Sequence, residues 1–210
     1  PFLPTRSNAL SYVDEVIVCD NASSAESFDG AIDHLLIEER LDQRELRNHL
    51  GLMLLSRRTR REAVDLDGTR PDEAASTLLS ERSSLLMWLV PSLGSQAANK
   101  IATSLRSTKI VRTNELTVRS VLELQGQTIE SEPKAQDALF EEDDRVLYVQ
   151  ASLGDKFWIP AFRAVFDSLT ASELGVDVGH LAMCAFNVVA ARDEEDARSI
   201  LEQAGFREPA

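Results

Sequence analysis

Two aspartates that flank a leucine and precede a glycine are the residues with the clearest chemical potential in this chain. Asp65 and Asp67 stand in the run Asp-Leu-Asp-Gly-Thr. A carboxylate can attack phosphorus when a neighbouring acid handles the proton and a magnesium ion neutralises the phosphate. The pair therefore suggests Mg²⁺-dependent phosphoryl chemistry with two catalytic aspartates. The competing interpretation is an Asp-Gly turn that joins a strand to a helix, because both residue types are favoured in turns.

The same run resembles the first motif of the haloacid-dehalogenase-like phosphatases. The resemblance implies that Asp65 is the nucleophile and Asp67 the general acid/base, and that both end a buried central strand. In this chain the preceding segment, 60–64, contains two arginines and a glutamate. Burial of that segment in a sheet would leave two guanidinium groups in an apolar environment without water, which is energetically costly. Arg70 also stands where the family keeps an apolar residue. We therefore favour the turn and keep the phosphatase as an alternative function.

A second candidate is a basic cluster of four arginines within five positions, namely Arg57, Arg58, Arg60 and Arg61. Clustered guanidinium groups can bind phosphate, nucleic acid or an acidic protein partner. They can also form a solvated face or compensate acidic residues elsewhere in the chain. The formal net charge of −13 favours compensation or protein docking over nucleic-acid binding, because nucleic-acid affinity depends on positive charge.

The histidines and cysteines form no recognisable metal or nucleophile pattern. His34, His49 and His180 lack the spacing of a metal site, and each is expected to be a half-buried packing residue. Cys184 follows His180 by four positions, which allows a Cys–His contact on a helix without a third orienting group. With only two cysteines, a disulfide framework is not expected, and a reducing, cytoplasmic location is. We expect no cofactor, apart from Mg²⁺ in the phosphatase alternative.

Length and composition indicate a folded chain without an obvious chemical identity. The 210 residues are 43% hydrophobic and 27% charged, which is typical of one large globular domain or two small ones. No apolar run approaches the roughly 20 residues of a membrane span. The chain opens on Pro-Phe-Leu-Pro rather than on methionine, so we expect it to be a piece of a longer protein or a processed product.

Acidic residues are segregated into two regions. The segment 14–39 contains eight acidic residues and no lysine or arginine. The run 141–144 places four carboxylates side by side, and their repulsion requires a solvated loop. Together with the basic cluster, these regions provide oppositely charged surfaces that can orient a protein contact.

Hydrophobic periodicity predicts the elements that position these residues. A strand is expected near 13–19, and helices over 30–55, 75–89 and 98–105. At about residue 108 the apolar period changes to two, which predicts a strand over 116–124 and a hairpin whose strands are 138–140 and 146–151. Three helices follow near 158–169, 181–189 and 197–204. The predicted fold is therefore α+β. Residues 1–107 are expected to form a mainly helical subdomain that has a short N-terminal strand. Residues 108–210 are expected to form antiparallel strands followed by three helices.

The order of features resembles a segment of sacsin-like proteins that carry GHKL (Bergerat-fold) ATPase modules. The matching stretches are short and lie in the same order along the chain: Pro1–Thr5, Glu15–Val18, Leu50-Gly51, Leu55-Ser56, Glu115–Arg119, Arg145–Val149, Trp158 and Glu194–Phe206. The nucleotide signatures of that family, Glu-x-x-x-Asn on a helix and a glycine-bearing Asp-x-Gly-x-Gly loop, are absent. The resemblance thus implies a region downstream of the ATPase module that does not hydrolyse ATP alone.

Together these observations predict a non-catalytic interaction or transducer region of a larger sacsin-like ATPase-containing protein. Its partner is expected to be a protein or a neighbouring domain of the parent chain, and not a membrane. Arg57, Arg58, Arg60 and Arg61 would form one contact surface, and the 14–39 block or the 141–144 loop the other. A nucleic-acid-binding module that uses the Arg57–Arg61 patch is the remaining alternative.

Overall fold

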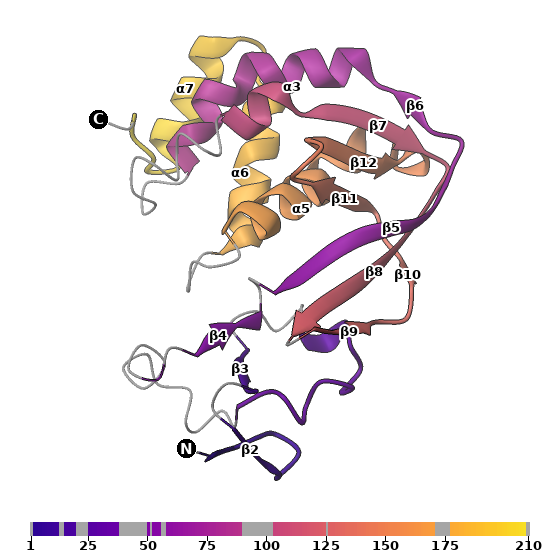
Figure 1. Ribbon diagram of the computed structural model, residues 1–210. Helices are drawn as coiled ribbons and strands as arrows, with labels where there is room; N and C mark the ends of the chain where they lie inside the picture. The colour runs from indigo at the N-terminus through magenta and orange to yellow at the C-terminus, as the bar shows by residue number, and fades with distance from the viewer. Residues whose placement is uncertain are drawn as a thin grey trace. The chain divides into compact units, whose positions relative to one another are not determined.

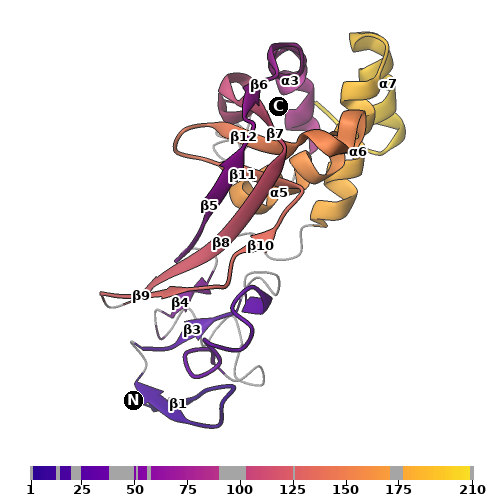
Figure 2. The same ribbon diagram turned by 90° about the vertical axis from the view of Figure 1, so that its right-hand side faces the viewer.

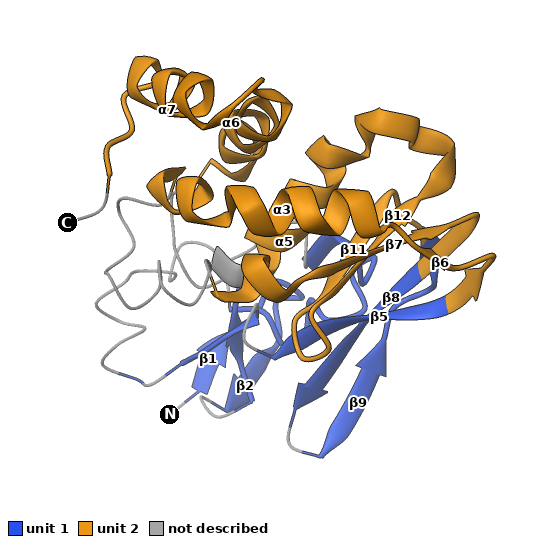
Figure 3. Cartoon of the chain, turned by 90° about the horizontal axis from the view of Figure 1, so that it is seen from above, with its two compact units in different colours: residues 1–64, 118–134, 171–174 blue, residues 65–117, 135–170, 175–210 orange. Residues whose placement is uncertain are grey.

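The computed structural model describes residues 2–12, 15–19, 25–37, 50, 52–55, 58–89, 103–124, 126–170 and 177–208. The chain is an α+β protein that forms two compact units (Figure 3). Unit 1 comprises residues 1–64, 118–134 and 171–174, and unit 2 comprises 65–117, 135–170 and 175–210. The predicted division gives two continuous segments, 1–107 and 108–210. Each unit of the structure instead combines three segments that alternate along the sequence.

Unit 1 is built from short strands and turns. β1 (Phe2–Pro4) pairs antiparallel with β2 (Leu10–Tyr12), and β3 (Ile17–Val18) pairs in parallel with β4 (Met53–Leu54). Its core is a small cluster of buried apolar side chains, Ile17, Phe28, Ile32, Leu36, Leu55, Leu122 and Leu124. The core therefore joins residues from both ends of the unit's sequence.

The prediction of a mainly helical first half is wrong, because this half is rich in strands. Residues 25–37 begin with a very short helical segment and continue as successive turns. They end in isolated β-bridges, in which Leu36 pairs with Ile17 and Ile37 pairs with Thr5. The turn bonds Ala31 N–H to Phe28 O, Asp33 N–H to Gly30 O and Leu35 N–H to Ile32 O all span three residues. Such turns bury residues at spacings of three and four just as a helix does, so the apolar pattern did not distinguish them. Most of the remaining predicted helix, 38–49, lies outside the described residues.

Two long strands run from one unit into the other. β5 (Thr59–Asp67) lies beside β8 (Glu115–Leu124), as Figures 1 and 2 show. The Asn114 N–H donates to the Asp67 carbonyl at 2.9 Å and the Glu123 N–H to the Arg58 carbonyl at 3.3 Å, which is an antiparallel register. The sequence predicted β8 from its apolar alternation. For β5 it implied only a strand before the Asp-Gly turn, without bounds, since β5 is charged and its last four residues are exposed.

Two further strands complete this sheet. β9 (Gln127–Glu130) folds back antiparallel on β8, with Leu124 opposite Gln127, and β10 (Lys134–Ala135) also pairs with β8. Gly126 adopts φ +77° in the tight β8–β9 connection, a conformation that glycine reaches without strain.

Unit 2 contains a mixed sheet in the order β11-β12-β7-β6 (Figure 1). β6 (Arg70–Pro71) runs antiparallel to β7 (Lys109–Thr113), and β11 (Ala138–Glu141) forms the predicted hairpin with β12 (Val146–Gln150). β7 and β12 are parallel, so the expectation of purely antiparallel strands is wrong. Parallel pairing requires a long connection between the two strands, here the excursion through β8 to β11.

The helices of unit 2 agree well with the sequence. α3 (Glu73–Leu86) continues into a 3₁₀ turn, η3 (Met87–Leu89), and η4 (Ala151–Phe157) leads into α5 (Trp158–Thr170). α6 (Val178–Ala190) and α7 (Glu194–Gln203) follow. Asp72, Asp177 and Asp193 cap α3, α6 and α7 by accepting a backbone N–H, which satisfies an otherwise orphaned donor. The three predicted C-terminal helices are thus confirmed.

One apolar core joins the sheet of unit 2 to its helices. Ile110, Phe140, Leu147 and Val149 supply the sheet side, and most of the other members come from α3, η3, η4, α5, α6 and α7. Phe157, Trp158, Phe162 and Phe166 form a row of rings with successive centroid distances of 4.4, 5.6 and 6.0 Å. Such contacts add to area burial, and they hold the start of α5 against the core.

Candidate functional site

Asp65 and Asp67 lie at the end of β5 and not in the turn itself. They are two positions apart on a strand, so they share one side of it, and both are exposed. The Asp67 carbonyl accepts hydrogen bonds from Asn114 N–H and from Thr113 Oγ1, the latter at 2.7 Å. The turn is confined to Gly68 and Thr69.

The surroundings of this pair differ from those that the phosphatase resemblance implies. β5 is antiparallel to β8 and is the last strand of its sheet order, rather than a buried parallel strand. Within the described part of the chain, no three His, Cys, Asp or Glu side chains are grouped so that they could hold a metal ion. The arrangement places two exposed carboxylates on one side of β5.

The basic cluster is divided between solvent and ion pairs. Arg57 lies outside the described residues, Arg58 is exposed in the turn before β5, and Arg61 is half-buried. Arg60 forms an ion pair with Glu123 across the sheet, and its Nε lies 3.5 Å from Glu62 Oε2. Arg60 therefore does not project as an uncompensated positive charge.

These ion pairs extend into what we call the charge ladder, formed by Arg60, Glu62, Arg119, Glu123 and Glu130. Arg119 Nε donates to Glu62 Oε1 at 2.6 Å and Nη1 donates to Glu130 Oε2 at 2.7 Å. The ladder thus crosses β5, β8 and β9 with three carboxylates and two guanidinium groups. Its net charge is negative, although the local sequence around Arg60 is basic.

The two acidic regions occupy different units. Of the 14–39 block, the structure describes Glu15, Glu26, Asp29 and Asp33, and Asp29 pairs with Lys134 at 3.2 Å. The 141–144 run forms the turn of the β11–β12 hairpin, as predicted. Burial, together with Glu141 and Asp144, raises the pKa of Tyr148 above its ordinary value.

Unit 1 also presents an apolar surface that sequence reasoning missed. Phe2 faces Tyr12 across β1 and β2, and Pro4 faces Leu10, so all four lie on one side of the hairpin. We call these residues the hairpin face. Phe2, Leu10 and Tyr12 are 56%, 69% and 53% exposed, and the rings of Phe2 and Tyr12 are 4.4 Å apart. The solvent exposure of these side chains has no signature in the sequence.

The hairpin face is held in shape from its turn and from its neighbours. Thr5 is buried, and its N–H donates to the Ala9 carbonyl at 2.9 Å. Asn8 occupies φ +61°, a conformation that asparagine tolerates better than most residues. The Tyr12 N–H donates to Glu15 Oε2 at 3.1 Å, which places a carboxylate beside the apolar surface.

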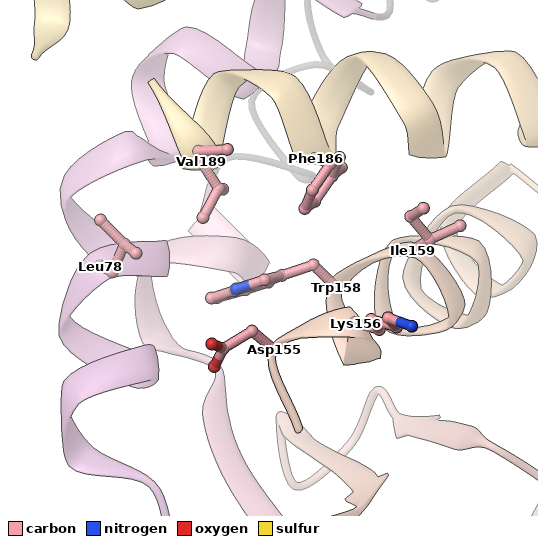
Figure 4. A pocket seen from close by; sticks show the side chains of 8 residues that line it. Leu78, Asp155, Lys156, Trp158, Ile159, Phe186 and Val189 are labelled. Atoms are coloured by element: carbon pink, nitrogen blue, oxygen red, sulfur yellow. The ribbon is translucent and has the colours of Figure 1, made fainter. Parts of the chain in front are cut away.

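Unit 2 contains a pocket of about 530 Å³ between α3, η4, α5 and α6 (Figure 4). Its walls are mainly apolar, and two charged side chains from η4 stand at its edge. The lining residues are Leu78, Asp155, Lys156, Trp158, Ile159, Phe186, Val189 and Ala190. The sequence predicts a helix that starts at Trp158, but it does not place Phe186 opposite Trp158, because their proximity depends on how α5 and α6 pack.

The Asp72–Arg112 ion pair helps to fix η4, the segment that carries the two charged residues at the edge of the pocket. Arg112 Nε donates to Asp72 Oδ2 and Arg112 Nη1 donates to the Gly154 carbonyl, both at 2.8 Å. Its guanidinium also lies over the Phe157 ring, 3.9 Å from the centroid. Burial would raise the pKa of Asp72, but the hydrogen bonds from Ala75 N–H and Arg112 outweigh it and lower that pKa.

Cys184 and His180 do meet on α6, as their spacing allows. Cys184 Sγ lies 3.7 Å from His180 Nε2. Burial raises the pKa of the Cys184 thiol above its ordinary value, which favours the unreactive protonated form. Neither Cys184 nor Cys19 forms a disulfide.

Comparison with known proteins adds no further assignment. No family model matches the chain, and neither a curated protein nor a solved structure matches it. Among the helices that the structure describes, none is both long and apolar enough to span a bilayer.

Proposed function

We propose that this chain is a non-catalytic interaction region that docks through the hairpin face of unit 1. The observation that carries the proposal is the clustering of Phe2, Leu10 and Tyr12, each more than half exposed, on one side of β1–β2. The partner is a protein or a neighbouring domain of the parent chain. As the sequence resemblance implies, the parent would be a larger sacsin-like protein with a GHKL ATPase module.

Exposed aromatic residues in a group support docking because they are the side chains that dominate protein interfaces. Tyr and Phe offer a large contact area and have few rotatable bonds. Single exposed apolar residues are ordinary, whereas an apolar group with a polar border marks an interaction site. The contact between the Phe2 and Tyr12 rings keeps the group together in the unbound state, which reduces the entropy lost on binding.

Charge next to the hairpin face indicates the complementary chemistry of the partner. Glu15 accepts a hydrogen bond from the Tyr12 backbone N–H, and Glu26, Asp29 and Asp33 belong to the same unit. A partner surface with an apolar centre and a basic border would match this arrangement. Such complementarity accelerates association and makes it sensitive to salt.

The docking proposal is tested by measuring which proteins are retained by three immobilised forms of the chain: the wild type, a test variant and a control variant. The test form carries Leu10→Ser and Tyr12→Ser, and the matched control carries Met183→Ser, a comparably exposed apolar residue in unit 2. We expect the wild type and the control to retain the same proteins and the double variant to lose at least one of them tenfold or more. Identical retention by all three forms would exclude the hairpin face as the docking surface.

The non-catalytic part of the proposal needs a separate measurement. In the phosphatase alternative, Mg²⁺-dependent hydrolysis of p-nitrophenyl phosphate is present and is abolished by Asp65→Asn. We expect no turnover above background for either the wild type or Asp65→Asn, with or without Mg²⁺. Turnover that requires both Asp65 and Mg²⁺ would replace our proposal with that alternative.

A further inference from the structure

We propose that the pocket between α3, η4, α5 and α6 binds a small, uncharged molecule with a flat apolar ring system. The volume of about 530 Å³ lies within the range of pockets that enclose drug-sized ligands. This site is separate from the hairpin face, since all of its lining residues belong to unit 2.

The aromatic side chains of the pocket favour a flat ligand. Figure 4 shows the Trp158 indole extended across the pocket, with the Phe186 ring directed toward it from α6. Leu78 and Val189 stand together at one end and Ile159 stands at the other. A ring system can therefore contact two aromatic surfaces while its edges meet aliphatic groups.

The two charged residues favour a ligand without net charge. Asp155 and Lys156 carry opposite charges, and Figure 4 shows their charged ends at separate places along the edge of the pocket. Both residues are exposed, so each can remain hydrated when the apolar part is filled. Together they offer one acceptor and one donor group for orienting a polar substituent.

The pocket is preorganised by contacts outside its lining. Trp158 lies in the ring row between Phe157 and Phe162, which fixes the plane of its indole. Arg112 holds the Gly154 carbonyl, immediately before Asp155, and is itself held by Asp72. A ligand therefore meets side chains that are already in place, which lowers the entropic cost of binding.

The test uses naphthalene dyes of the same ring size and different charge. N-phenyl-1-naphthylamine is neutral, 8-anilinonaphthalene-1-sulfonate is anionic, and a naphthylmethyl-trimethylammonium salt is cationic. In a Trp88→Phe background, Trp158 is the sole tryptophan, so its emission reports the pocket. We expect saturable one-to-one binding with energy transfer from Trp158 to N-phenyl-1-naphthylamine, and at least fivefold weaker binding of both charged dyes, measured by competition.

Two substitutions test whether the dye occupies this pocket. Ala190→Phe places a ring at an exposed lining position, and Phe186→Leu removes one aromatic surface while it retains an apolar side chain. We expect each to weaken dye binding tenfold or more, whereas Met183→Ala, outside the lining, should leave it within twofold. Circular dichroism checks that each variant is folded. If Ala190→Phe does not fold, dye binding by Phe186→Leu alone tests whether the dye occupies the pocket.

The inference is overturned by any of three results. These are an absence of saturable binding, equal dye affinity in Phe186→Leu and the wild type, or tighter binding of a charged dye than of the neutral one. None of these results bears on the hairpin face, so the docking proposal stands or fails separately.

Discussion

The two units reach a folded state by different physical means. Unit 2 has one continuous apolar core and three helices with aspartate N-caps. Unit 1 has a small core, four strands of two or three residues beside parts of the longer β5 and β8, and a partly exposed ladder of ion pairs. Burial of apolar area is the dominant stabilising term in proteins, while exposed ion pairs contribute little. We therefore expect unit 2 to be the more stable unit, while unit 1 carries the group of exposed apolar side chains that forms the hairpin face.

The largest change in stability should come from removing a large side chain from the core of unit 2, and it should distinguish this core from that of unit 1. Phe162→Ala in unit 2 should lower the free energy of unfolding by about 3–5 kcal/mol, because Phe162 is 1% exposed within the ring row. The measurement is urea unfolding followed by tryptophan fluorescence, which reports unit 2 because Trp88 and Trp158 both belong to it.

Ile32→Ala is the matched change in the core of unit 1, where Ile32 is fully buried. It should increase amide hydrogen exchange at Ile17 and Leu36 while shifting the tryptophan-reported transition much less than Phe162→Ala does. Equal shifts of the tryptophan signal would show that the two cores unfold as one cooperative unit.

The next effect concerns the Asp72–Arg112 pair of unit 2. Asp72→Ala removes both the cap of α3 and the partner of Arg112, and should lower stability by about 2 kcal/mol at neutral pH. Since the folded-state pKa of Asp72 is lowered, its contribution is fully present above the unfolded value near 4 and is lost as pH falls through the folded value.

The difference in unfolding free energy between the wild type and Asp72→Ala should therefore narrow below about pH 4. Thermal unfolding from pH 7 to pH 2 measures it. Lys134→Ala, which removes an exposed pair with Asp29 in unit 1, is the control and should show almost no stability change. A difference that stays constant down to pH 2 would assign no role to the ionised carboxylate.

A smaller effect is expected at the turn after β5. Gly68 has φ +62°, and an added Cβ would lie 2.1 Å from Asn114 Nδ2. Gly68→Ala should cost about 1 kcal/mol from the left-handed backbone, provided that the Asn114 amide moves aside. The double variant with Asn114→Ala tests this, since it should retain the backbone penalty and remove any steric one.

The smallest effect should come from the charge ladder. Arg119→Ala removes two ion pairs whose members are partly or largely exposed, so the stability change should stay below about 1 kcal/mol. The change should decrease further in 1 M salt, where exposed charges are screened. A salt-independent loss of several kcal/mol would instead show that the aliphatic part of Arg119 packs in the core.

The contrast between the units also explains what the sequence could predict. In unit 2, α5, α6, α7 and the 138–150 hairpin follow from apolar spacing because each buries one face against a large core. In unit 1, β5 depends on backbone pairing with β8 and on contacts such as Arg60 with Glu123, 63 residues away. Such non-local pairing has no local pattern, so neither the extent of β5 nor the neutralisation of Arg60 could be predicted.

The candidate sites show the same division. The sequence singled out the arginine cluster around Arg60 as a candidate contact surface, but the partners of Arg60, Glu62 and Glu123, became evident only from the strand pairing. The hairpin face lacks a sequence signature because Phe2 and Tyr12 are as apolar as core residues. The pocket requires α3, α5 and α6 to converge, which depends on tertiary packing.

The interleaving of the units has a practical consequence for dissecting the molecule. Shortening the chain from either end removes parts of one unit without releasing the other, because each is assembled from three segments. Residues 64 and 118 lie on adjacent, antiparallel strands, so an internal excision of 65–117 closed by a tight loop joins neighbouring backbone. A gene designed in this way, rather than a series of nested deletions, is the rational route to a minimal docking fragment.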